Sequence, residues 1–166
     1  HGAAIPREYI NPVQAGIRES LENGVLAGYP VLDIKVSLVD GSYHPVDSSE
    51  MAFKMAGSMA IKAGIKKARP VLLEPIMNIE IIVPGDYLGE VLGDINGRRA
   101  QIKSMEGQGD IQIIKGEIPL SETFGYATTI RSLTQGRGTY SLEFDTYQET
   151  PQSITLQIVK AFGGGH

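Results

Sequence analysis

The order of strand-like and helix-like segments between residues 76 and 147 constrains the fold more than any other feature of the sequence. Apolar residues alternate with polar ones in some segments, which predicts strands, and recur at steps of three and four in others, which predicts helices. In chain order we expect strand 76–83, helix 86–96, strand 99–105, strand 111–118, helix 121–133 and strand 138–147. This βαββαβ order is that of a ferredoxin-like α+β sandwich.

The residues before this pattern predict a second, smaller domain of mixed helix and strand. Apolar residues at helical spacing follow Pro6 and indicate a helix of about four turns that ends near Asn23. Residues 31–39 alternate strictly and predict a strand with one apolar face. A helix is expected over 48–66, with Asp47 and Glu50 forming a capping box at its start and methionines and alanines on its apolar side.

Pro70 and Pro75 bracket the change of character, so we place the domain boundary at residue 73. The predicted organisation is an incomplete α/β domain over 1–73, a ferredoxin-like domain over 74–150 and a C-terminal tail over 151–166. The first part carries 8 basic and 7 acidic side chains, and the remainder carries 7 and 12. An RNA backbone would therefore be repelled less by the first domain than by the second.

Composition excludes several classes of protein. The 42% hydrophobic and 20% charged residues predict a folded core, and the formal net charge of −4 argues against a uniformly basic nucleic-acid coat. The sequence has no cysteine, so it has neither a disulfide framework nor a thiolate nucleophile. It contains no P-loop motif and no apolar run long enough for a membrane span, so we expect no nucleotide hydrolysis by this chain and no membrane partner.

The loop between the expected strand 31–39 and helix 48–66 is the strongest candidate site. Gly41 permits a sharp turn, Pro45 stiffens the chain, and Tyr43 and His44 are large groups that can stack on bases or donate to phosphate and ribose. We expect this loop to contact RNA through a set of neighbouring residues: Gly41, Ser42, Tyr43, His44, Pro45, Asp47, Ser48 and Ser49.

Catalysis or metal binding by the same loop is less well supported by the spacing of its residues. A catalytic triad needs each group to be oriented by the next in a sheltered pocket, which one exposed loop rarely supplies. His44, Asp47 and Glu50 lack the paired-histidine spacing of a metal site, so we predict no metal and no catalytic residue. Lys54 and Lys62 lie on one stripe of the following helix and could contact RNA at its flank. Arg98 and Arg99 could bind phosphate, although cations at a helix end commonly offset the helix dipole.

Five segments closely resemble the C-terminal part of bacterial-type translation elongation factor G. They occur in the order of that family and extend the resemblance to about Val159: GAAIPREYINPVQAGIRESLENGVLAGYPVLDIKVSL at 2–38, GSYHPVDSSEMAFKMA at 41–56, LLEPIMNIEIIVP at 72–84, GEVLGDINGRRAQI at 89–102 and PLSETFGYATTIRSLTQGRGTYSLEF at 119–144.

This resemblance implies that residues 1–73 are most of domain IV and residues 74–150 are domain V, with the first strands of domain IV missing. It implies a parent protein that is a ribosome-dependent GTPase of the cytoplasm or an organelle matrix, which promotes translocation of tRNA and mRNA. GTP and Mg²⁺ would bind the parent's nucleotide domain and not this chain. The loop carrying His44 would meet the codon–anticodon duplex in the decoding region, and domain V would touch ribosomal RNA at the stalk base. We expect a monomer.

Two alternatives remain at this level. A paralogue acting in ribosome recycling or ribosome protection has the same domain layout, and a free-standing ferredoxin-like interaction module would have no ribosomal role. The sequence departs from the resemblance at Pro45, where many members have an acidic residue, and at Ala100, where glycine is common. Pro45 would make the loop stiffer and less negative.

Overall fold

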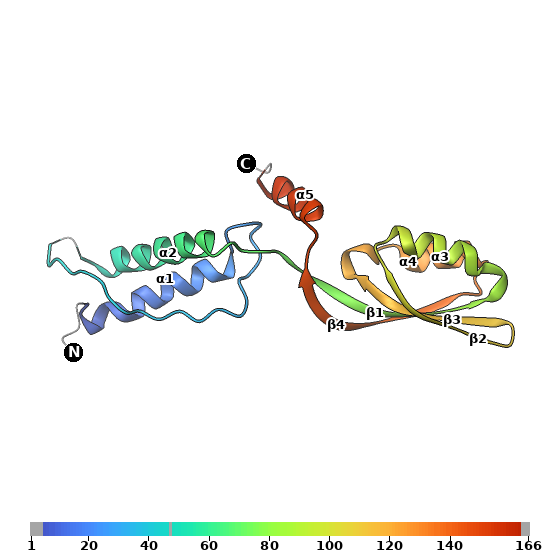
Figure 1. Ribbon diagram of the computed structural model, residues 1–166. Helices are drawn as coiled ribbons and strands as arrows, with labels where there is room; N and C mark the ends of the chain where they lie inside the picture. The colour runs from blue at the N-terminus through green and yellow to red at the C-terminus, as the bar shows by residue number, and fades with distance from the viewer. Residues whose placement is uncertain (1–4, 47, 164–166) are drawn as a thin grey trace. The chain divides into compact units, whose positions relative to one another are not determined.

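The computed structural model describes residues 5–46 and 48–163. The chain divides into two compact units: one contains the residues up to Leu72 together with those from Pro151 onward, and the other is Leu73–Thr150 (Figure 1). The first is called unit 1 below and the second unit 2. The mixed helix and strand content confirms the predicted α+β class.

Unit 2 is a four-stranded antiparallel sheet with two helices on one face (Figure 1). The strand order is β2-β3-β1-β4, so the first strand lies inside the sheet between the third and the fourth. The elements are β1 (Leu73–Pro84), α3 (Leu88–Gly97), β2 (Gln101–Gln108), β3 (Ile111–Pro119), α4 (Tyr126–Thr134) and β4 (Thr139–Glu149). Short 3₁₀ turns precede α3 and α4, so α4 begins five residues later than the expected helix over 121–133.

The core of unit 2 follows directly from the alternation in β1. Ile79, Ile81 and Val83 point to the helical face and are at most 2% exposed. They pack with β3 residues and with Val91, Ile95, Tyr126 and Ile130 of the two helices. Because successive strand residues point to opposite faces, alternate positions of one strand supply the sheet side of this core. Burial of such side chains stabilises the fold by about 1.5–3 kcal/mol each.

Unit 1 is built on two helices, α1 (Ile10–Glu22) and α2 (Glu50–Lys67), which lie against each other. Their backbones approach closely at two glycines. Gly16 of α1 lies against the Lys54 carbonyl, and a Cβ atom on Gly57 of α2 would lie 2.6 Å from the Val13 carbonyl oxygen. Glycine at these positions therefore sets the distance between the two helices.

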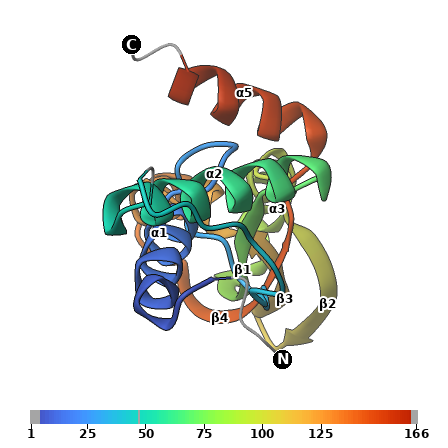
Figure 2. The same ribbon diagram turned by 90° about the vertical axis from the view of Figure 1, so that its left-hand side faces the viewer.

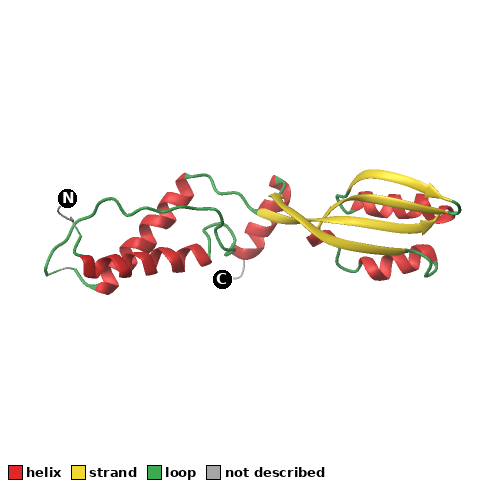
Figure 3. Ribbon diagram, turned by 90° about the horizontal axis from the view of Figure 1, so that it is seen from below, coloured by secondary structure: helices red, strands yellow, loops and turns green. Residues whose placement is uncertain are grey.

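The strand expected over residues 31–39 is wrong, because the structure has no strand there (Figure 3). A strand needs a neighbour for its backbone hydrogen bonds, and the described residues of unit 1 contain no other strand. The segment instead runs as extended chain beside α2, where Val31 and Val36 line a groove with Ile61 and Ile65. Asp33 has φ of +55°, which interrupts a regular strand.

Two details of α2 also differ from expectation. Ser49, not Asp47, is the N-cap: its Oγ accepts a hydrogen bond from the Ala52 N–H at 3.1 Å. Asp47 itself lies outside the described residues. The methionine side expected to be apolar core is exposed, with Met59 68% accessible, because α1 packs on the face of Phe53 and Gly57 instead.

The segment expected as a C-terminal tail contains a helix, α5 (Gln152–Gly163), which belongs to unit 1 (Figure 2). Phe162 of α5 reaches the loop after α1. A Cβ atom on Gly28 would lie 2.8 Å from the Phe162 ring. The chain therefore contributes to unit 1 both before and after unit 2.

Candidate nucleic-acid interface

The loop from Gly41 to Ser49 is held by a pair of hydrogen bonds between His44 and Ser48. The His44 N–H donates to Ser48 Oγ at 3.0 Å, and the Ser48 N–H donates to the His44 carbonyl at 2.9 Å. This reciprocal pair joins two residues that are four positions apart. The Gly41 N–H donates to Asp40 Oδ1 at 2.8 Å, which stabilises the start of the loop. Gly41 also lies against the Ile5 side chain, where a larger residue would clash.

A row of aromatic rings connects the loop to the core of unit 1. The Tyr43 ring lies 5.7 Å from the Tyr9 ring, and Tyr9 stacks on Phe53 at 4.4 Å. Phe53 is only 8% exposed and packs with Ile5 and Val13. Burial raises the pKa of Tyr9 above its usual value, and the neighbouring Glu8 charge adds to this shift. The contact with Tyr9, which itself stacks on Phe53, therefore restricts the position of the Tyr43 ring.

The predicted loop residues are brought together on one exposed surface. Gly41 through Pro45 are all exposed, and Tyr43 is 37% accessible although its ring touches Tyr9. The His44 side chain is exposed, so both ring nitrogens can meet a ligand. A phenol and an imidazole presented this way can donate hydrogen bonds to phosphate or ribose and can stack on unpaired bases.

Ser48 and Ser49 use their hydroxyl groups inside the loop. Ser48 Oγ accepts from the His44 backbone, and Ser49 Oγ caps α2. Capping of this kind stabilises a helix by about 1 kcal/mol. These two serines therefore shape the loop, whereas Tyr43 and His44 present functional groups outward.

The two lysines predicted at the flank differ in their surroundings. Lys54 Nζ forms an ion pair with Glu19 Oε1 of α1 at 2.9 Å. Lys62 is exposed, two turns further along α2, and lines a cavity beside the loop that follows α1. Lys62 is therefore freer to meet an outside anion than Lys54 is.

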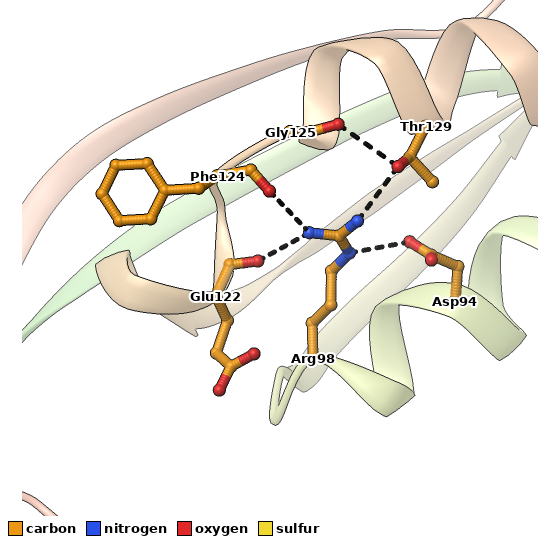
Figure 4. A network of polar contacts seen from close by, with 6 residues as sticks. All are labelled: Asp94, Arg98, Glu122, Phe124, Gly125 and Thr129. Atoms are coloured by element: carbon orange, nitrogen blue, oxygen red, sulfur yellow. Dashed lines mark hydrogen bonds and ion pairs between the residues drawn. The ribbon is translucent and has the colours of Figure 1, made fainter. Parts of the chain in front are cut away.

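Arg98, also predicted as a flanking contact, lies in unit 2 and is surrounded by acceptors (Figure 4). Its guanidinium donates to Asp94 Oδ2 at 3.1 Å, to the Glu122 carbonyl at 2.8 Å and to Thr129 Oγ1 at 3.0 Å. A weaker bond of 3.3 Å reaches the Phe124 carbonyl. These bonds connect the end of α3 to the start of α4, so Arg98 has a structural role in unit 2.

Arg99 is held by two carboxylates in the same unit. It forms a bidentate pair with Glu74 at 2.9 and 3.0 Å, and its Nε donates to Glu122 Oε1 at 3.1 Å. The hydrogen bond to Glu74 raises the pKa of Arg99 further above its usual value. The backbone of Arg99 is left-handed, with φ of +59°. Neither arginine lies in the unit that carries the loop.

Sequence reasoning missed Tyr9, because nothing in local spacing connects it with Tyr43 or Phe53. It also missed the acceptors of the two arginines, since Glu74 and Glu122 come from distant segments. Within residues 5–46 and 48–163, no three His, Asp or Glu side chains gather into a group that could hold a metal ion. In the same described part of the chain, no helix combines the length and apolar character required to cross a bilayer.

Comparison with known proteins agrees with this architecture. Residues 1–69 match the family model described as elongation factor G, domain IV, and residues 71–158 match the model described as elongation factor G C-terminus. A crystal structure from Thermus thermophilus superposes with a TM-score of 0.80 at 40% identity, covering 99% of this chain and 25% of that one. The chain thus spans about a quarter of that relative, and the two family matches show that it belongs to the elongation factor G family.

Proposed function

We propose that this chain is the ribosome-contacting end of a translation factor that promotes translocation of tRNA and mRNA. The single observation that carries the proposal is the loop of unit 1, in which exposed Tyr43 and His44 are backed by Tyr9 and Phe53. A loop braced in this way loses little conformational entropy on binding, which favours insertion into a crowded RNA site.

In this proposal the loop enters the decoding region and meets the codon–anticodon duplex. Tyr43 and His44 supply donors to ribose and phosphate, while the backbone of Gly41 and Ser42 allows close approach. Lys62 and the paired Lys54 would face phosphates at the flank of α2, where no acidic residue occurs between Glu50 and Glu74. The Ser48 and Ser49 hydroxyls would keep the loop in shape, and Asp47 belongs to the same proposed contact set.

We assign the chain a mechanical and not a catalytic role. Binding of GTP and Mg²⁺ and hydrolysis of GTP would belong to another part of the parent protein, and unit 2 would contact ribosomal RNA near the stalk base. We leave Arg98 and Arg99 out of the proposed RNA contacts, because their guanidinium groups already bind carboxylates and carbonyls. The chain would act as a monomer wherever ribosomes work, in the cytoplasm or an organelle matrix.

Replacing His44 with Ala in the full-length parent tests the proposal. Loss of one neutral hydrogen bond to RNA is worth about 0.5–1.5 kcal/mol, so translocation should slow by up to about tenfold while GTP hydrolysis on ribosomes continues. Rapid kinetics with a fluorescent mRNA measures the first rate and phosphate release measures the second.

Val46→Ala is the matched control, because Val46 lies in the same loop, is 93% exposed and carries no polar group. It should leave both rates unchanged. Normal translocation by the His44→Ala variant would remove His44 from the mechanism. A variant that translocates normally but fails to split ribosomes would instead support the recycling paralogue.

A further inference from the structure

We propose that a second RNA contact lies in unit 1 away from the loop: a cavity between α2, α5 and the loop after α1 that takes one unpaired nucleotide of an RNA strand. The inference rests on the proposed function for its partner class, and it adds a cavity lined by Lys66, Tyr29 and Phe162 beside Lys62, which that proposal already places against RNA. It is carried by the juxtaposition of two lysines and two exposed aromatic rings around a preformed cavity of about 590 Å³.

Part of the cavity lining is a tight loop that follows α1. The Gly24 N–H donates to the Tyr29 carbonyl at 2.8 Å, and the Val31 N–H donates to the Leu21 carbonyl at 2.8 Å. Gly28 has φ of +75°, a conformation that favours glycine. These bonds shape the loop before any ligand arrives, which limits the entropy lost on binding.

Two aromatic side chains line the cavity. Phe162 of α5 lies over Gly28, where a Cβ atom would come within 2.8 Å of its ring. Tyr29 is the next residue in the chain, and both rings are accessible, at 61% for Tyr29 and 52% for Phe162. An exposed ring offers a stacking surface to any base, because every base has an aromatic face.

Two lysines of α2 also line the cavity. Lys62 and Lys66 lie four residues apart on α2, so their side chains occupy neighbouring positions on one face. Neither lysine forms an ion pair within the described residues, whereas Lys54 of the same helix pairs with Glu19. No acidic residue occurs between Met51 and Leu73. The positive charge of Lys62 and Lys66 is therefore available to an outside anion.

Cationic and aromatic side chains that line one cavity match the chemistry of a nucleotide, which carries a phosphate beside a flat base. The cavity volume is in the range of sites that bind small ligands. Bases inside a duplex already stack on their neighbours, whereas an unpaired base has a free face for a protein ring, so an unpaired base is the occupant that fits. The free nucleotide has the same chemistry, but a strand gains further phosphate contacts from Lys67 and Arg69 nearby on the chain.

Binding of a fluorescein-labelled, eight-nucleotide adenylate RNA to the full 166-residue chain tests the cavity. Fluorescence anisotropy should show that Lys62→Gln with Lys66→Gln weakens binding and lowers the salt slope of log K by about 1.4, or about 0.7 for each charge on single strands. The control loses the same charge in unit 2, through Lys103→Gln with Lys115→Gln, and should change the slope less. Equal salt slopes for the two double variants would contradict the proposal that RNA binds in the cavity.

Substitutions of Tyr29 test whether its aromatic ring stacks on the bound base. Tyr29→Leu should bind the RNA about tenfold more weakly, while Tyr29→Phe keeps the ring and should bind like the original chain. Because Tyr29 is exposed, both variants should fold, which circular dichroism checks. Equal affinities of the leucine and phenylalanine variants would also overturn the proposal.

Two further measurements separate the possible sources of failure. The first compares how well AMP and unlabelled RNA, at the same millimolar concentration of nucleotide, displace the labelled RNA. Equal displacement by the two competitors would contradict an RNA strand as the occupant. Sedimentation with purified ribosomes tests the proposed function independently. A chain that binds ribosomes but shows no difference between the double variants retains the proposed function and loses the cavity. A chain that binds no ribosomes at all loses the proposed function.

Discussion

Tyr126 combines full burial with an unsatisfied hydroxyl group, which is unusual for a residue at the centre of a core. It is 1% exposed, and its hydroxyl has no hydrogen-bond partner among the described residues. Burial raises the pKa of Tyr126 to about 12. The Arg98 guanidinium lies 5.0 Å from the centre of its ring and the Tyr140 ring lies 4.9 Å away. Unit 2 therefore favours the neutral phenol strongly over the phenolate.

Tyr126→Phe should change the free energy of unfolding by less than about 1 kcal/mol at pH 8, because it removes a buried group without a partner. The pKa of Tyr126 is higher in the folded than in the unfolded chain, so its contribution is complete below pH 10 and is lost as pH rises through 12. At pH 11 the original chain should have lost roughly 1 kcal/mol that the variant keeps. Urea unfolding followed by circular dichroism at both pH values measures this difference. Parallel loss of stability in both proteins would contradict the burial effect.

At the residue scale, the sequence predicted the surroundings of individual side chains less well than it predicted the helices and strands. The exposed placement of Tyr43 and His44 agrees with the expectation for a turn built on Gly41 and Pro45, while their contact with RNA stays a prediction. Arg98 and Arg99 drew attention as cations at a helix end, but their surroundings depend on carboxylates and carbonyls from other segments. Side-chain partners that are distant in sequence leave no periodic signal.

At the scale of elements, the packing of α1 on α2 depends on two glycines that most sequence patterns would ignore. Gly57→Ala should destabilise unit 1 by about 1–3 kcal/mol, because the new methyl group would meet the Val13 carbonyl at 2.6 Å and push the helices apart. Thermal unfolding followed by circular dichroism measures the loss.

Gly64→Ala is the matched control on the same helix. Nothing lies within 4 Å of the added Cβ atom, and alanine is a better helix former by up to about 1 kcal/mol. This variant should be as stable as the original chain or slightly more stable. A similar loss in both variants would show that glycine itself, and not the close approach of α1, matters at these positions.

Alternating segments that have a neighbouring strand in the fold were predicted well from sequence, and the alternating segment without one was not. The four strands of unit 2 pair with one another, and their alternation predicted them within a few residues. The segment 31–39 has equally regular alternation, but no strand among the described residues of unit 1 pairs with it. The exposed methionines of α2 have the same origin, since periodicity finds an apolar face but not the element that covers it.

At the scale of the molecule, the two units differ in the depth of their cores. Among the described residues, unit 2 has a cluster of nine buried side chains, while the corresponding cluster in unit 1 has three. Amide hydrogens of β1 and β3 should therefore exchange more slowly than those of α1 and α2, because local opening is easier where fewer apolar side chains are buried. Hydrogen exchange with mass spectrometry measures this order. Equal protection of the two units would contradict it.

The connections of unit 2 have a consequence for engineering. Leu73 and Glu149 pair directly across β1 and β4, so the points where the chain enters and leaves unit 2 are neighbours. Paired residues in an antiparallel sheet have Cα atoms about 5 Å apart. Leu73–Thr150 is thus an inserted unit whose two ends lie side by side. A short linker could join these ends, and new termini could be introduced at the turn between β2 and β3. Such a circular permutant would keep every strand pairing of the sheet while moving the attachment point to its opposite end.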